Sequence, residues 1–421
     1  MKPLKAIMIG AGQRGNAYAE HAITNPSDLE FVGVAEPHQK RQRTFAEKYN
    51  IDKANRLNTW EDVFTRDKWA DCVIICTPDK LHYAPAMAAI EKGYDILLEK
   101  PSSPNPQECI EIADAADKKG VKVVVCHVMR YTPFATQIKN VIDSGEIGRI
   151  MTIVHNENVG NVHQSHSFVR GNWNSALTSS PMILAKSCHD MDFLQWLIGK
   201  KCLRLSSFGA LSYFNRDNCP LDAPPRCIDG CPVACEYDSR KLYLESDNDW
   251  FRSVAVGHYN PTDDEVVAAL KTGPYGRCVF QCDNDVVDHQ VVSMAFEDDI
   301  TVLFSMTAFT PDISRSIKIM GTKGQIKAHT SHKNAIVTNF ATGEEREIDT
   351  TATAVGGHGG GDAGIMTAFV DYLRGADVKD ISDARISAEN HMLCFAAEES
   401  RLNSGAVVEM EAFIANKKQA L

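Results

Sequence analysis

The feature that most constrains how this chain folds is a glycine-rich turn near its start. The turn, GAGQRG, occupies residues 10–15, where the apolar run 5–10 ends and an amphipathic segment reaching about residue 25 begins. In a strand–turn–helix unit, Gly10 permits a tight turn, Gly12 lets a pyrophosphate approach the backbone, and Gly15 lets the helix pack on the strand. The sequence therefore predicts a dinucleotide-binding turn.

The same alternation of apolar run and amphipathic segment continues through the first third of the chain. Such alternation is typical of βαβ units, whose strands form a parallel sheet. The expected strands are residues 5–10, 30–35, 71–76, 94–98 and 121–126, and the expected helices are 38–49, 80–92 and 105–118. We expect a doubly wound Rossmann domain of the α/β class over residues 1–130.

The remainder, residues 131–421, has a different pattern. Strand-like runs follow one another with turn residues between them, which is typical of an α+β domain with a large, mainly antiparallel sheet. The expected strands are 149–155, 202–212, 291–296, 300–309 and 315–320, and the expected helices are 181–198, 362–374 and 383–403. Residues 214–276 are polar, rich in Cys, Pro and Asp, and lack periodicity, so we interpret them as an insertion or lid.

The bulk composition restricts the partners. The chain has 421 residues, which favours two domains, and a formal net charge of −11. An acidic balance argues against nucleic acid or an anionic membrane as the main partner. No apolar run reaches the roughly 18 residues of a membrane span, and the N-terminus lacks a signal-peptide pattern. We expect a cytoplasmic protein with a small-molecule substrate.

Residues at the carboxyl ends of the expected strands indicate the cofactor. The helix N-terminus at Gln13 and Arg14 offers free N–H groups to phosphate. Glu36 ends the second strand, where a carboxylate binds the adenosine ribose hydroxyls and repels a 2′-phosphate, which favours NAD over NADP. Lys40 and Arg41 follow closely and leave NADP open as the less favoured cofactor.

Two further loops are expected to touch the cofactor. Thr77 and Pro78 follow the third strand, and His82 after them either contacts the cofactor or caps the next helix. The fourth strand ends in Glu99 and Lys100. Lys100 either forms a structural pair with Glu99 or binds a substrate hydroxyl and stabilises charge on its oxygen as hydride leaves.

These motifs resemble the Gfo/Idh/MocA family, which includes glucose–fructose oxidoreductase and inositol 2-dehydrogenase. The resemblance rests on the glycine turn, the TPxxxH run at residues 77–82, the EKP run at 99–101, and a His-bearing helix before an antiparallel sheet. It implies NAD(P)-linked oxidation or reduction at a CH–OH carbon of a sugar or cyclitol. It also implies a C-terminal sheet through which a homodimer or homotetramer forms, and it makes Lys100 the catalytic lysine.

The resemblance implies roles for residues 185–189 as well. His189 matches the general-base histidine, but Ala185 stands where the family has Asp. One turn apart on a helix, these positions share a face. The neighbouring Lys186 is interpreted as taking part of the missing role. His127, which replaces an Asn of the family after the fifth strand, is expected at the cofactor.

Polar groups after strands five and six are expected to line the substrate pocket, because each buried hydroxyl of a polyol needs a hydrogen-bond partner. Each of them is otherwise an ordinary loop residue. The expected substrate residues are Arg130, Asn158, His163, Arg170 and Trp173, together with Lys186 and His189.

Six cysteines of the insertion region leave a structural zinc site open. They are Cys219, Cys227, Cys231, Cys235, Cys278 and Cys282. Thiolates in a reduced protein can hold Zn²⁺, but this spacing differs from a CxxC knuckle, and reduced cysteines without metal are the alternative.

Three functions remain open from the sequence. The first is a sugar or polyol dehydrogenase that transfers hydride to the nicotinamide. The second is an NAD-dependent glycosidase or lyase that oxidises its substrate transiently and retains its NAD. The third is a non-catalytic NAD-binding sensor, against which Lys100 and His189 count.

Overall fold

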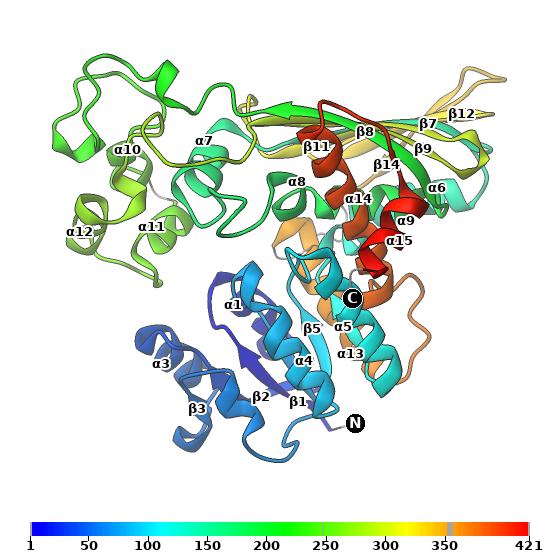
Figure 1. Ribbon diagram of the computed structural model, residues 1–421. Coiled ribbons are helices and arrows are strands. Elements are labelled where there is room, and N and C mark those ends of the chain that lie inside the picture. Colours follow the sequence, from blue (N-terminus) through cyan, green and yellow to red (C-terminus); the bar gives the residue numbers. More distant parts are fainter. Residues whose placement is uncertain (1, 247, 352–356, 420–421) are drawn as a thin grey trace.

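The computed structural model describes residues 2–246, 248–351 and 357–419, which form two sheets with helices between them (Figure 1). The first sheet is wholly parallel, and its strand order is β3-β2-β1-β4-β5-β6. Its strands are β1 (Leu4–Ile9), β2 (Leu29–Ala35), β3 (Arg56–Leu57), β4 (Cys72–Ile75), β5 (Asp95–Leu98) and β6 (Val123–Val125). This order confirms the doubly wound Rossmann prediction. The two-residue β3 was missed because it is too short to carry a pattern.

Helices follow the strands as the alternation predicts. They are α1 (Gln13–Ala19), α2 (His21–Thr24), α3 (Gln39–Lys48), α4 (Tyr83–Glu91), α5 (Pro106–Lys119) and α6 (Pro133–Asp143). A helix from much later in the chain covers part of one face of this sheet. Ile365, Met366 and Phe369 of α13 (Gly361–Leu373) pack in one buried cluster with Met8 and Ile74 of the sheet. A helix of the predicted second segment therefore belongs to the Rossmann layers.

The second sheet has the order β14-β13-β12-β11-β7-β10-β9-β8-β15. Its strands are β7 (Ile150–Asn158), β8 (Cys202–Ala210), β9 (His289–Phe296), β10 (Thr301–Thr307), β11 (Ser314–Gly321), β12 (Gly324–His329), β13 (Asn334–Asn339), β14 (Glu345–Asp349) and β15 (Val408–Glu409). β7 pairs with β10 in parallel and the other neighbours are antiparallel. The predicted mainly antiparallel sheet is thus confirmed, although β12 to β15 were not predicted.

One face of the second sheet is covered by helices that also touch the Rossmann domain. α14 (Ala384–Leu402) packs on α5, on β8 and on α9 (Cys188–Ile198). Within the described ranges no helix covers the other face, as the view in Figure 1 shows. Alternation along each strand puts apolar side chains such as Phe304 on the covered face and Leu303 on the open one, where it is 45% exposed.

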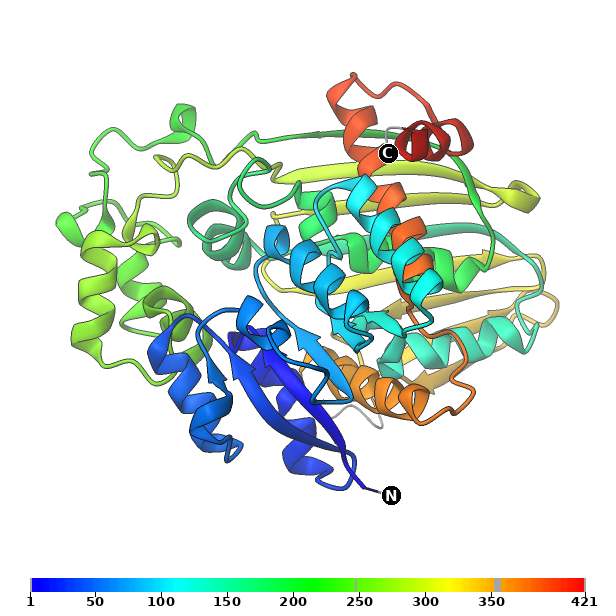
Figure 2. The same ribbon diagram turned by 60° about the horizontal axis from the view of Figure 1, so that its bottom comes forward.

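The chain between β8 and β9 contains the insertion, which is largely irregular up to Asp238 and mainly helical from Ser239 onward. Its helices are α10 (Ser239–Tyr243), α11 (Asp249–Val256) and α12 (Asp263–Thr272). Tyr243, Phe251 and Leu270 form a small core of its own. Figures 1 and 2 show α11 and α12 at one end of the molecule, on the side of the Rossmann helix α3. No helix in the described segments is both long and apolar enough to cross a membrane.

Neutral histidines are packed into the interior. Burial lowers the pKa of His166 and of His391 to about 3, and it lowers that of His127, His163 and His189 well below the usual value. The unfolded chain binds protons on these side chains below about pH 6.5, whereas the folded chain does not.

We expect the folded state to lose stability as the pH falls below about 7 toward the lowered pKa values, by up to ~1.4 kcal/mol per pH unit for each such histidine. Urea unfolding at several pH values measures this. His166→Phe keeps an aromatic ring beside Tyr243 and Tyr275 and should flatten the pH dependence by one group. The comparison at pH 8 isolates its effect on packing, and an unchanged slope would contradict the assignment.

The glycine turn gives a second prediction. A Cβ on Gly15 would lie 2.3 Å from the Gly10 carbonyl oxygen and 2.9 Å from Met8 Sδ, whereas a Cβ on Gly12 meets nothing within 4 Å. Gly15→Ala should therefore lower the free energy of unfolding by about 1–3 kcal/mol through overpacking. Gly12→Ala is the matched control and should change it little. Equal losses in the two variants would show that the contact at Gly15 is not the cause.

Candidate active site

The carboxyl ends of β1, β4, β5 and β6 meet at one edge of the parallel sheet, which faces the second domain. At that edge Gly10 has φ +90° and its Cα lies against Cys76, since a Cβ there would be 2.6 Å from the Cys76 carbonyl oxygen. Gly12 is the N-cap residue of α1, and no side chain caps this helix N-terminus. The open space over Gly12 fits a dinucleotide backbone, as the sequence predicts.

Glu36 lies beneath the same turn. Its Oε2 accepts a hydrogen bond from the Ala11 N–H at 2.9 Å, and its Oε1 accepts one from the His38 N–H at 2.9 Å. The carboxylate is 4% exposed and is thus fixed at the end of β2. This is the place at which an acidic side chain meets an adenosine ribose in Rossmann folds.

Arg14 and Glu99 belong to a network that joins the glycine turn to the start of α13. Arg14 donates to Glu99 Oε1 at 3.2 Å and to both carboxylate oxygens of Asp362 at 2.7 and 3.0 Å, while Tyr18 Oη donates to Glu99 Oε2 at 2.8 Å. Burial alone would raise the pKa of Glu99, but Arg14 and Lys100 hold it below its usual value. Asp362, at the start of α13, also accepts from His358.

His82 connects two loops of the site. Its Nε2 lies 2.7 Å from the Thr77 carbonyl oxygen and its Nδ1 lies 2.6 Å from that of Pro101. The loop that carries Thr77 and Pro78 is thereby tied to the loop after Lys100. Both ring nitrogens contact the protein itself, so His82 positions these loops.

Lys100 reaches across the cleft at the end of β5. Its Nζ donates a hydrogen bond to the Ala185 carbonyl oxygen at 2.7 Å. The single helix predicted over 181–198 is wrong, because the chain forms α8 (Met182–Ala185) and then α9, with a break at Lys186 and Ser187. The expected shared face of residues 185 and 189 is therefore absent. Ala185 offers Lys100 a backbone acceptor where the family pattern has a carboxylate.

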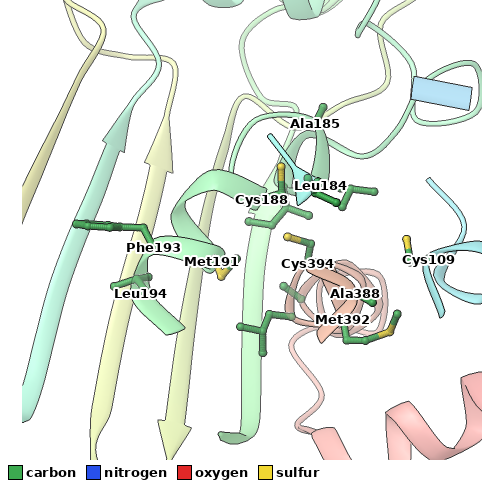
Figure 3. Close-up of a cluster of buried hydrophobic side chains, with 14 of the residues drawn as sticks. Cys109, Leu184, Ala185, Cys188, Met191, Phe193, Leu194, Ala388, Met392 and Cys394 are labelled. Atoms are coloured by element: carbon green, nitrogen blue, oxygen red, sulfur yellow. The ribbon is translucent and has the colours of Figure 1, made fainter. Parts of the chain in front are cut away.

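His189 is the second residue of α9 and is 5% exposed. Burial and then Lys100 lower its pKa well below the usual value, so the ring is neutral near pH 7. Its Nδ1 is buried without a hydrogen-bond partner among the described residues. Figure 3 shows what fixes this helix: Cys188 and Met191 lie at the junction with α14, near Cys394. A neutral imidazole on a rigid helix can accept a proton.

Lys186 is paired with a carboxylate that the sequence analysis missed. Its Nζ lies 3.2 Å from Glu157 Oε1, and Arg315 Nη2 lies 2.6 Å from Glu157 Oε2. Burial lowers the pKa of Lys186, although Glu157 acts in the opposite direction. Arg315 also donates to Asp190 Oδ1 at 2.8 Å. Glu157 was overlooked because β7 extends three residues beyond the predicted strand. The signal was a charged residue at an inward position, two after the buried His155.

Arg130 is engaged in a buried ion pair. Its Nε and Nη2 donate to the two oxygens of Asp192 at 2.7 and 2.6 Å, and Asp192 also accepts from Asn390 at 2.7 Å. The guanidinium is 4% exposed and has no free face for substrate. His127 lies beside this pair, with its ring centroid 6.1 Å from that of His189 and 5.3 Å from that of His391. It packs under α9.

The other predicted substrate residues are divided by the structure. His163 and Trp173 lie near the cleft: Lys186 and Lys100 contribute to the low pKa of His163 after burial, and Trp173 Nε1 donates to Asp79, in the loop after β4, at 3.2 Å. Asn158 is on the opposite face of β7 from Glu157 and donates to Ser314 there.

Arg170 has a structural role in place of the predicted substrate contact. It is 1% exposed and donates to the Arg277 and Tyr237 carbonyl oxygens at 2.8 and 2.7 Å. It belongs to the π-helix Gln164–Arg170 and holds the insertion in place.

The zinc hypothesis finds no support. Among the described residues no group of three or more His, Cys, Asp or Glu side chains is arranged to hold a metal ion. Cys227, Cys231, Cys235 and Cys278 line one cavity, but as free thiols.

Comparisons with known proteins agree with this geometry. Residues 4–127 match the family model GFO_IDH_MocA, described as an oxidoreductase family with an NAD-binding Rossmann fold, and residues 139–407 match its C-terminal alpha/beta domain. YteT of Bacillus subtilis (strain 168), named as an oxidoreductase, is 26% identical over 79% of this chain and 80% of its own length. Inositol 2-dehydrogenase of Salmonella typhimurium is 29% identical over 47% of this chain and 55% of its own length.

A solved structure shares the fold. The inositol dehydrogenase homolog from Azotobacter vinelandii, complexed with NAD+, is 14% identical with a TM-score of 0.69, covering 97% of each chain. The two family models together account for most of the sequence, and the two matched regions correspond to the two sheets found here. This chain is therefore an enzyme of the GFO_IDH_MocA oxidoreductase family, with an NAD-binding Rossmann fold.

Proposed function

We propose that the enzyme is an NAD-dependent dehydrogenase that oxidises a secondary hydroxyl group of a sugar, sugar derivative or cyclitol. The observation that carries this proposal is the convergence of Lys100, from the end of β5, and His189, from α9, beside the nicotinamide edge of a Rossmann sheet. Relatives named inositol 2-dehydrogenase and D-glucoside 3-dehydrogenase support the substrate class.

NAD supplies a hydride acceptor when bound. The chain supplies the handling of the proton and of the charge on oxygen. Lys100 can exchange its Ala185 carbonyl acceptor for the substrate hydroxyl oxygen and stabilise the negative charge that develops there. His189, neutral at pH 7 because its pKa is low, accepts the hydroxyl proton.

The charges around Lys100 and His189 favour a negatively charged substrate oxygen. A carboxylate at residue 185, as in the family pattern, would favour it less. Lys186 and Arg315 share Glu157, and Arg315 also faces Asp190, so the anionic groups nearest the reacting centre are already paired. We propose that Lys186, released in part from Glu157, assists Lys100 at the substrate oxygen. His163 and Trp173 complete the polar and apolar walls of the substrate site.

Glu36 supports NAD as the cofactor. Its fixed carboxylate suits the ribose hydroxyls and disfavours a 2′-phosphate. The backbone N–H groups of Ala11 and His38 already bind this carboxylate, so its position does not depend on a bound ligand.

We also propose that a second copy of this chain covers the open face of the second sheet. Exposed apolar side chains gather there, and a large apolar patch on a folded protein marks an interaction site. They are Leu203, Phe208, Val291 and Leu303.

Lys100→Met and His189→Ala should each lower kcat by about 10²–10⁴-fold, because each removes a group that handles the reacting oxygen or its proton. NAD binding and the melting curve should change little. Lys122→Met is the matched control, since Lys122 Nζ also donates to a backbone carbonyl, that of Tyr372, at 2.5 Å. The assay follows NADH with a panel of sugars and cyclitols and measures released cofactor.

If kcat of either variant fell by less than about threefold, that residue would be excluded from the chemistry, since such a change is under 1 kcal/mol of barrier. Turnover without net NADH formation would instead favour the glycosidase or lyase that retains its NAD.

Leu303→Lys should shift the molar mass in solution from oligomer to monomer, because it places a charge in the apolar centre of the proposed interface. Light scattering after size-exclusion chromatography measures this. Leu221→Lys is the control, as Leu221 is 99% exposed in the insertion, outside the strands of the second sheet. A monomeric wild type would overturn the assignment of this face.

A further inference from the structure

We propose that Glu265 of the insertion determines cofactor specificity by holding the Lys40 ammonium group away from the adenosine ribose, so that the enzyme rejects a 2′-phosphate. The inference rests on the proposed function, because it assumes that the Rossmann cleft binds a nicotinamide dinucleotide. It assigns to the insertion a part in a site that the Rossmann domain forms alone in a simple βαβ unit.

The insertion supplies a wall of a cavity at the adenosine end of the cleft, of about 120 Å³. The glycine turn contributes Ala11 and Asn16 to this cavity. The beginning of α3 contributes Lys40, Arg41, Thr44 and Phe45, and the insertion contributes His258, Tyr259 and Asn260. The Glu36 carboxylate is adjacent, because it binds the Ala11 N–H at 2.9 Å. The views in Figures 1 and 2 agree in placing α3 beside the α11–α12 end of the insertion.

Both basic side chains of this cavity are engaged by the insertion. Lys40 Nζ lies 3.0 Å from His258 Nε2 and 3.4 Å from Glu265 Oε1. Arg41 Nε donates to the Gly257 carbonyl oxygen at 2.5 Å. Lys40 and Arg41 are the cations that could otherwise pair with a phosphate on the ribose, because they follow Glu36 on the first turn of α3.

Glu265 is anchored independently of Lys40. Its Oε2 accepts from the Thr262 N–H at 2.8 Å in a capping box at the start of α12. This backbone hydrogen bond, followed by Lys40, lowers the pKa of Glu265 to about 2, so the side chain is charged at any working pH. A 2′-phosphate in the cavity would meet the anions Glu36 and Glu265 and would find Lys40 already paired. A ribose hydroxyl meets no such repulsion.

Glu265→Gln removes the charge and keeps the cap, because glutamine can accept the same Thr262 N–H. We expect the Kd of NADPH to fall about three- to fivefold, which is the range of an exposed ion pair, while the Kd of NADH stays within about twofold. The gain should shrink as salt is added. Asp264→Asn is the matched control: it removes one charge from an adjacent, exposed side chain of α12, and it should leave both Kd values unchanged.

A second substitution shows whether Lys40 carries the effect. In the double variant with Lys40→Met, the gain in NADPH affinity should disappear, whereas a gain that persists would overturn the inference. An unchanged ratio of the two Kd values in Glu265→Gln would overturn it too. Binding is followed by the fluorescence of NADH and NADPH, without turnover. If NADH binds to the wild type but the ratio is insensitive to Glu265, the inference fails and the proposed function stands. If neither cofactor binds to the wild type, both fail.

Discussion

The geometry of the active site depends on two buried ion pairs that hold α9 from opposite sides. Arg130, which follows the Rossmann strand β6, binds Asp192 through two hydrogen bonds, and Arg315 of β11 in the second sheet binds Asp190. Each carboxylate is fully buried, so removal of either partner would leave an uncompensated charge, at a cost of about 3–5 kcal/mol. His189 precedes both carboxylates on the same helix. The His189 imidazole is thus fixed relative to both domains at once.

The same arrangement sets the electrostatics of the site. Arg315 contacts both Asp190 of α9 and Glu157 of β7, and Lys186, at the break before α9, also contacts Glu157. Anions and cations therefore alternate along this row of four side chains. In a dry interior such paired charges act as fixed dipoles that need no reorganisation during a reaction. Lys100 stands at the end of this chain with a backbone carbonyl as its partner. This carbonyl oxygen is neutral, and the ammonium group can exchange it for an oxygen that becomes negative.

Local patterns in the sequence predicted the parts of the fold that are made locally. The glycine turn, Glu36 and the alternation of apolar runs were sufficient for the parallel sheet, because each βαβ unit is contiguous in the chain. Arg130 was correctly placed at the end of a strand, but its partner Asp192 is 62 residues away, and no local signal shows that the guanidinium is already satisfied. Glu157 depends on the pairing of β7 with β10 and β11, which the sequence does not reveal.

The region after β7 shows why polar residues alone were a poor guide to the substrate site. The side chains of this region that were predicted to bind substrate divide among three structures with different requirements. Asn158 donates a hydrogen bond to a neighbouring strand, His166 and Arg170 bind the insertion, and Trp173 donates to the loop after β4. The π-helix between them carries side chains to the insertion on one side and adjoins the cleft on the other. The insertion, which contacts α3 at its far end, is therefore tied through His166 and Arg170 to the segment that leads into the cleft. The insertion therefore links α3 of the Rossmann domain to the segment that follows β7.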